Sequence, residues 1–199
     1  MNQPTEIPDD LPLGTVWKSF AFLAAAAALL MLLFQGPEYM RNLWSLDHVL
    51  QEAAAGAGAG IVFAAVVLGL YAVSAIKLPD NVYIRLIERL AAKKYGLFTI
   101  AVGAGVSEEF LFRGALLGMT AGFTGETPAL LLISLLFMAL HIPQYKGSIL
   151  IHVIVFMMGV VLGLLFLRTE ALWAPVAAHA VYNAVLTWFM KKRKPLEES

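Results

Sequence analysis

Long apolar runs with few charges constrain this chain more than any other feature of its sequence. Residues 56–76 and 148–167 are built almost entirely from apolar and small side chains. A run of about 20 such residues is long enough to cross a bilayer as an α-helix. The chain is 60% hydrophobic and 14% charged, whereas soluble domains carry about 25% charged residues. The sequence therefore predicts an integral membrane protein.

Six segments fit this description, and the polar stretches between them are mostly short. We predict an all-α, polytopic transmembrane helix bundle of about six spans, with one or two short interfacial amphipathic helices. Residues 1–199 would form one integral membrane domain with a motif core at about 96–190 and mobile tails at 1–13 and 192–199. The acidic leader favours a retained first span over a signal peptide. The predicted spans are 17–34, 56–76, 96–122, 128–143, 148–167 and 172–190.

Positive charges collect on one side of this predicted topology, which indicates its orientation. Excess lysine and arginine marks the cytoplasmic face, so both termini are expected there. The short loops favour a prokaryotic inner (plasma) membrane. The formal net charge of zero gives no reason to expect nucleic acid as a partner. One side holds Lys18, Lys77, Arg85, Arg89, Lys93, Lys94, Lys146, Lys191, Lys192, Arg193 and Lys194, and the other holds Arg41 and Arg168.

The polar segment 78–95 has the pattern of an amphipathic helix. Arg85, Arg89 and Lys93 recur every four residues, opposite an apolar face. Such a helix is typical of a segment that lies on the anionic cytoplasmic leaflet, with membrane lipids as its partner. A solvated connecting helix is the alternative. The apolar face consists of Val82, Leu86, Ile87 and Leu90.

Glycines recur inside several predicted spans. Two glycines four residues apart lie on one helix face, where they let another helix approach closely. We interpret these residues as packing positions without chemistry. They are Gly56, Gly58 and Gly60, the pair Gly114 and Gly118, and the pair Gly159 and Gly163.

Three charged residues lie inside the third predicted span, where charge is costly. Each charge at mid-bilayer costs about 2.5–3.5 kcal/mol, so such residues are usually functional or paired. Glu109 and Arg113 are four residues apart, share a helix face and can form an ion pair. Glu108 points about 100° away from Glu109 and is left available. A carboxylate in such a site suits a general base or acid, although a purely structural charge cluster is the alternative.

Two histidines and an asparagine lie in later spans at compatible depths. His141 is near the cytoplasmic end of the fourth span, and His179 and Asn183 share one face of the sixth. Each alone fits a structural role: His141 an interfacial side chain, and the other two an interhelical hydrogen-bonded pair. Glu108 is twelve residues from Gly96, and His179 is twelve residues from Lys191, at the cytoplasmic ends of their spans. The side chains could therefore meet in the cytoplasmic half of the bilayer.

A carboxylate, two imidazoles and a carboxamide can together hydrolyse an amide bond. The reaction needs a positioned water, a base for its proton and donors for the oxyanion. The chain has no cysteine for thiol catalysis and no His-Glu-x-x-His zinc motif. Glu108, His141 and His179 could nevertheless hold a divalent metal such as zinc with one open position. From the residues alone, activation of water by metal and activation by carboxylate both stay open.

Three short motifs are similar to the signatures of the CPBP family, which comprises CAAX prenyl endopeptidases and bacterial bacteriocin-processing and immunity (Abi) proteins. They are Glu-Glu-Phe-Leu-Phe-Arg at 108–113, Phe-Met-Ala-Leu-His at 137–141 and His-Ala-Val-Tyr-Asn at 179–183, in the family order. The resemblance implies an intramembrane endopeptidase open to the cytoplasm. It implies that Glu108 and His141 activate water, that His179 and Asn183 stabilise the oxyanion, and that Glu109 and Arg113 support the geometry. The family is described both as metal-dependent and as glutamate-type, so the cofactor stays open.

The resemblance also implies a substrate that is itself attached to a membrane. Prenylated CAAX proteins, bacteriocin-type peptides and membrane-anchored sorting tails are the substrate classes associated with the family. Two other functions compete with proteolysis. One is a non-enzymatic immunity or scaffold membrane protein. The other is a transporter that uses Glu108, Glu109 and the histidines as an ion or proton relay.

Overall fold

The computed structural model describes residues 11–192. All regular elements within this range are helices. The predicted mobility of the outermost tail residues, and the charges Arg193 and Lys194, lie outside the described residues. Helix α10 still includes Lys192, which the prediction had placed in a tail. The elements are α1 (Leu13–Phe34), α2 (Pro37–Asn42), α3 (Val49–Ala72), α4 (Val82–Ala92), α5 (Gly96–Phe98), η1 (Thr99–Ala104), α6 (Gly105–Glu109), η2 (Phe110–Leu117), α7 (Gly118–Thr124), α8 (Glu126–Leu140), α9 (Ile149–Thr169) and α10 (Trp173–Lys192).

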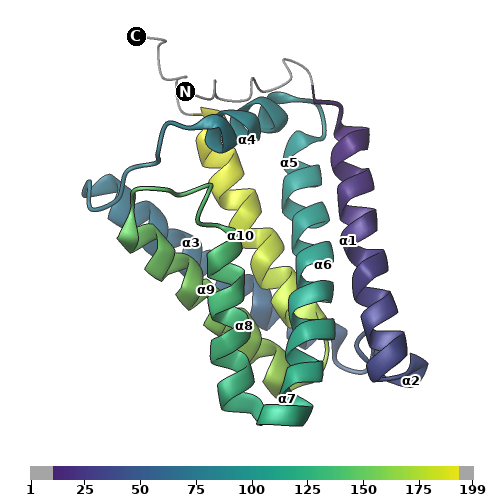
Figure 1. The fold of residues 1–199 in the computed structure, drawn as a ribbon. Coiled ribbons are helices and arrows are strands. Elements are labelled where there is room, and N and C mark those ends of the chain that lie inside the picture. The colour runs from purple at the N-terminus through teal and green to yellow at the C-terminus, as the bar shows by residue number, and fades with distance from the viewer. Residues whose placement is uncertain (1–10, 193–199) are drawn as a thin grey trace, which may run out of the picture.

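The helices pack side by side as a bundle, with α4 lying across one end and α2 at the other (Figure 1). Among the described residues, α1, α3 and α9 are long and apolar enough to cross a membrane. The chain is thus an integral membrane protein, but the predicted count of about six spans is not confirmed. Helix α8 has only 15 residues, fewer than the roughly 20 that a span needs. The polar residues His179 and Asn183 reduce the hydropathy of α10.

The third predicted span is one continuous column of five consecutive helical segments, from α5 to α7 (Figure 1). Two of them, η1 and η2, are π-helices. They flank α6, which carries Glu108 and Glu109. π-Helical turns are rare and frequently occur at functional sites. The prediction assumed a regular α-helix, so these wider turns are a departure from it.

This column is sandwiched between two other helices at the level of its first half. A Cβ atom on Gly103 would collide with the Phe20 ring of α1, and one on Gly105 would lie 3.2 Å from the backbone nitrogen of Ala180 in α10. The two glycines therefore let α1 and α10 approach opposite sides of the column. This packing brings the face of α10 that carries His179 against α6.

The α3–α10 pair is the clearest case of close packing through small residues. Gly56 and Gly60 lie one turn apart on α3, and a Cβ atom on either would overlap the backbone of Ala174 or Ala178 in α10. The packing role predicted for these two glycines is confirmed. Gly58 has no atom within 4 Å of its hypothetical Cβ, so the same prediction was wrong there. It lies on another face of the helix. Close contacts also surround Gly114, Gly118, Gly159 and Gly163.

Helix α4 confirms an amphipathic helix within 78–95. Asn81 caps it by accepting hydrogen bonds from the backbone nitrogens of Tyr83 and Ile84, each at 3.0 Å. Its buried residues are Ile84, Leu90 and Ala91, so the inner face includes Ile84, which the prediction had left out. The helix lies across the end of the bundle where α1 begins and α10 ends (Figure 1).

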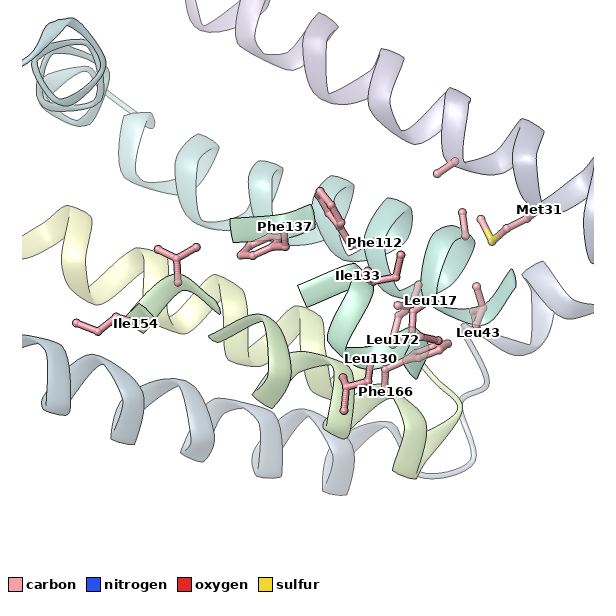
Figure 2. Close-up of a cluster of buried hydrophobic side chains, with 14 of the residues drawn as sticks. Met31, Leu43, Phe112, Leu117, Leu130, Ile133, Phe137, Ile154, Phe166 and Leu172 are labelled. Carbon is pink, nitrogen blue, oxygen red and sulfur yellow. The ribbon is translucent and has the colours of Figure 1, made fainter. Parts of the chain in front are cut away.

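The apolar core lies between the column, α8, α9 and the segments at the α2 end. Figure 2 shows Phe112 beside Phe137 in this core, with Leu117, Leu172 and Leu43 grouped further along it. Phe112 and Phe137 make an edge-to-face contact with 5.0 Å between ring centroids. A backbone hydrogen bond from Leu172 to Leu43, at 2.9 Å, ties the start of α10 to the segment after α2. This core fixes α8, and therefore His141, against the column.

Candidate active site

Glu109 is the centre of a buried polar cluster that joins two helices. The guanidinium of Arg113 donates from Nη1 to Oε1 of Glu109 at 2.9 Å, which confirms the predicted ion pair. His179 of α10 donates from Nδ1 to the same oxygen at 2.6 Å. The three side chains are at most 6% exposed. A carboxylate and a guanidinium buried this deeply are tolerated because each compensates the other's charge.

Arg113 also connects this cluster to the α9 backbone. Its Nη2 donates to the carbonyl oxygen of Gly159 at 3.0 Å. Gly159 itself packs against Ser134 of α8, with 3.0 Å between its hypothetical Cβ and the serine Cβ. The guanidinium therefore holds the column, α8 and α9 in one register, while Glu109 holds α10. The cluster has the contacts expected of a scaffold for neighbouring groups.

Glu108 lies off this cluster, on another side of α6, as the helical geometry predicts. Its side chain is partly buried, and its Oε2 is a buried oxygen without a hydrogen-bond partner among the described residues. A buried carboxylate oxygen without a donor is costly. Such an oxygen can accept a proton or a hydrogen bond from a substrate or a water.

His141 lies directly after the last residue of α8, in the turn that leads to α9. Its Nδ1 is 2.7 Å from the carbonyl oxygen of Phe137. A carbonyl oxygen can only accept, so Nδ1 carries the proton in this contact. In the neutral imidazole, Nε2 then has a free lone pair. The residue has the tautomer that a proton acceptor requires.

His179 and Asn183 do not form the hydrogen-bonded pair that was one alternative for them. His179 is bound to Glu109 instead, and Asn183 is partly buried. The contact between His179 and Glu109 joins the third and sixth predicted spans at one depth, as the distances from the cytoplasmic ends indicated. Because Nδ1 is engaged, Nε2 of His179 is the ring nitrogen left for other partners.

Phe137 and Tyr145 are parts of the site to which the sequence reasoning gave no role. The Phe137 ring centroid is 4.6 Å from that of His141 and 6.0 Å from that of His179. Arg113 lies over the same ring at 4.8 Å. Tyr145 stacks on His141 with nearly parallel rings, 6.5 Å between their centroids. Phe137 has a sequence signal, since it precedes His141 by one helical turn, whereas Tyr145 follows in an irregular turn.

The predicted metal set does not assemble in the part of the chain that the structure describes. Residues 11–192 contain no group of three histidine, aspartate or glutamate side chains arranged to hold a metal ion. The described residues therefore contain no preassembled three-ligand metal site.

A cavity of about 520 Å³ lies near the α2 end of the bundle, away from these residues. It is lined by polar residues that include Asp47, His48 and Glu52. None of the six candidate site residues contributes to it. The cavity is thus separate from the candidate site.

Comparison with known proteins identifies the segment that carries these residues. Residues 91–185 match the family model described as Type II CAAX prenyl endopeptidase Rce1-like. No curated protein and no solved structure matches the chain. The matched segment begins at the end of α4 and includes all six candidate residues. The match over residues 91–185, which hold all three motifs, is thus to the Rce1-like type II CAAX prenyl endopeptidases, within the CPBP family that those motifs predicted.

Proposed function

We propose that this protein is an intramembrane endopeptidase that hydrolyses peptide bonds of membrane-associated or lipidated protein substrates. The family match supports a protease-type function. The proposal is carried by what the structure shows of two side chains, Glu108 and His141. One has a buried carboxylate oxygen without a partner, and the other has an imidazole whose Nδ1 is held by a backbone carbonyl. Both groups can accept a proton from the same water.

In the proposed reaction, a water molecule donates one hydrogen to Glu108 and the other to Nε2 of His141. The water oxygen attacks the substrate carbonyl carbon, and Glu108 takes the proton. A tetrahedral intermediate forms, with its negative charge on the former carbonyl oxygen. The C–N bond then breaks, and the proton on Glu108 passes to the leaving nitrogen. The products are a carboxyl and an amino terminus, so atoms and charges balance.

The oxyanion would be stabilised by His179 and Asn183. The Asn183 amide can donate through its two N–H groups. Nε2 of His179 can donate only if the imidazole is doubly protonated, since Nδ1 already donates to Glu109. An imidazolium would give the site two positive groups, His179 and Arg113, against Glu108 and Glu109. This charge balance favours the arrangement in a membrane.

In the proposed mechanism, Glu108 and His141 activate the water directly, without a metal ion. The end of the bundle with the basic side chains of α4 is expected to face the cytoplasm. Membrane-anchored peptides, including prenylated and tail-anchored proteins, would then enter from the lipid with their scissile bonds near the cytoplasmic surface. A plasma membrane of a prokaryote remains the expected location.

The test compares wild type with Glu108→Gln on a library of membrane-anchored peptides, with new termini read by mass spectrometry. Removal of a general base is expected to lower the rate by about 10²–10⁴-fold. Glu126→Gln is the matched control, because Glu126 is an exposed glutamate at the start of α8. Equal cleavage by wild type and Glu108→Gln would remove Glu108 from the mechanism. No cleavage by wild type, with pH-dependent ion flux that Glu108→Gln abolishes, would favour the relay function instead.

A further inference from the structure

The turn between α8 and α9 is held in place by the surface helix α4. Asn81, the N-cap of α4, donates from Nδ2 to the carbonyl oxygen of Gln144 at 2.7 Å. The same side chain accepts two backbone hydrogen bonds at the start of α4. Asn81 thus fixes both the start of α4 and the turn that follows His141. The turn is ordered by these bonds although it has no regular structure of its own.

Tyr145 is the residue of this turn that reaches the site. Its ring plane is 9° from that of His141, with 6.5 Å between centroids. Its hydroxyl oxygen accepts a hydrogen bond from Nε2 of Gln144 at 2.8 Å. Accepting this bond leaves the hydroxyl's own proton free to be donated. Tyr145 also packs against the main apolar core.

The phenol of Tyr145 keeps its proton throughout the physiological range. Burial, with a smaller contribution from the negative charge of Glu108, raises the pKa of Tyr145 to about 12. Among the described residues, the Oε2 oxygen of Glu108 has no hydrogen-bond partner. The contact that Tyr145 makes with the candidate site is therefore the one between its ring and His141.

We propose that Tyr145 is a positioning residue of this site: its ring fixes the orientation of the His141 imidazole. This inference rests on the proposed function for its kinetic consequences. With the ring in place, the Nε2 lone pair of His141 keeps one direction. A base that is held in one orientation then meets its water without rearrangement.

The test separates the ring from the hydroxyl with Tyr145→Phe and Tyr145→Leu. Tyr145→Phe keeps the ring and is expected to keep a kcat near that of wild type. Tyr145→Leu removes the ring and is expected to lower kcat by about 10–100-fold with KM unchanged, because the base is no longer held in one orientation. Tyr83→Phe, at a tyrosine exposed on α4, is the matched control with unchanged kinetics. Wild-type kcat in Tyr145→Leu, or equal losses in Tyr145→Phe and Tyr145→Leu, would overturn the role of the ring.

A second readout needs no activity. Histidine-labelled protein gives imidazole NMR signals for four histidines, and the signal of His141 is assigned by its loss in His141→Gln. Tyr145→Leu is expected to shift this signal, and Tyr145→Phe to leave it near its wild-type position. An unshifted His141 signal in Tyr145→Leu would overturn the positioning role. If wild type cleaves no peptide, the proposed function fails, and the NMR signal still decides whether Tyr145 orients His141.

Discussion

Arg113 is fully buried, yet its guanidinium has a partner on each side. Nη1 donates to Glu109 and Nη2 to the Gly159 carbonyl. Part of this arrangement follows from the sequence, because four-residue spacing predicts the ion pair with Glu109. The contact with Gly159 does not follow from it, since no local spacing relates residues 46 positions apart. For the same reason, the bond between His179 and Glu109 needed the folded structure.

Arg113→Ala is expected to impair folding more than chemistry. Removing one partner of a buried pair leaves an uncompensated charge and costs about 3–5 kcal/mol. Thermal unfolding in detergent should show a large fall in Tm, whereas Arg41→Ala, at an exposed ion pair, should change Tm little. A variant Arg113→Ala with wild-type Tm but no cleavage would instead assign the guanidinium to the reaction.

At the scale of elements, the sequence predicted the positions of the main helices but not their irregularities. Apolar runs and flanking charges locate all six long helical segments, because a helix in lipid must satisfy its own backbone. The π-helical turns on both sides of α6 carry no such signal. The pattern of apolar residues does not distinguish these wider turns from a regular α-helix. The turn with Tyr145 was missed for a similar reason, since its order comes from the distant residue Asn81.

The α3–α10 contact gives a prediction at this scale. Gly60→Ala should destabilise the protein by about 1–3 kcal/mol, because its Cβ would overlap the backbone of Ala178 and force the helices apart. Gly58→Ala, two residues away, should be neutral or stabilising by up to about 1 kcal/mol, since its Cβ meets open space and alanine favours the helix. The two Tm values are measured in the same detergent. Equal losses in both variants would show that helix packing does not depend on this face.

At the scale of the whole molecule, the basic side chains and the turn that follows His141 lie toward the same end of the bundle. The start of α1, helix α4 and the end of α10 gather there, and α2 and α7 lie at the opposite end (Figure 1). The Asn81–Gln144 hydrogen bond ties the turn after His141 to the α4 end. Most lysines and arginines lie in the segments of that end. If the positive-inside rule sets the orientation, the candidate site receives its substrates and water from the cytoplasmic side.

Single-cysteine labelling tests this orientation cleanly, because the native chain has no cysteine. Ala92→Cys places an exposed thiol at the end of α4, and Thr127→Cys places one near the start of α8 at the opposite end. In intact cells, a membrane-impermeant maleimide should label Thr127→Cys, and it should label Ala92→Cys only after the membrane is opened. The reverse pattern would place the α4 end outside the cell. The site would then be limited to substrates on the outer face, such as secreted or surface-anchored peptides, and prenylated cytoplasmic proteins would be excluded.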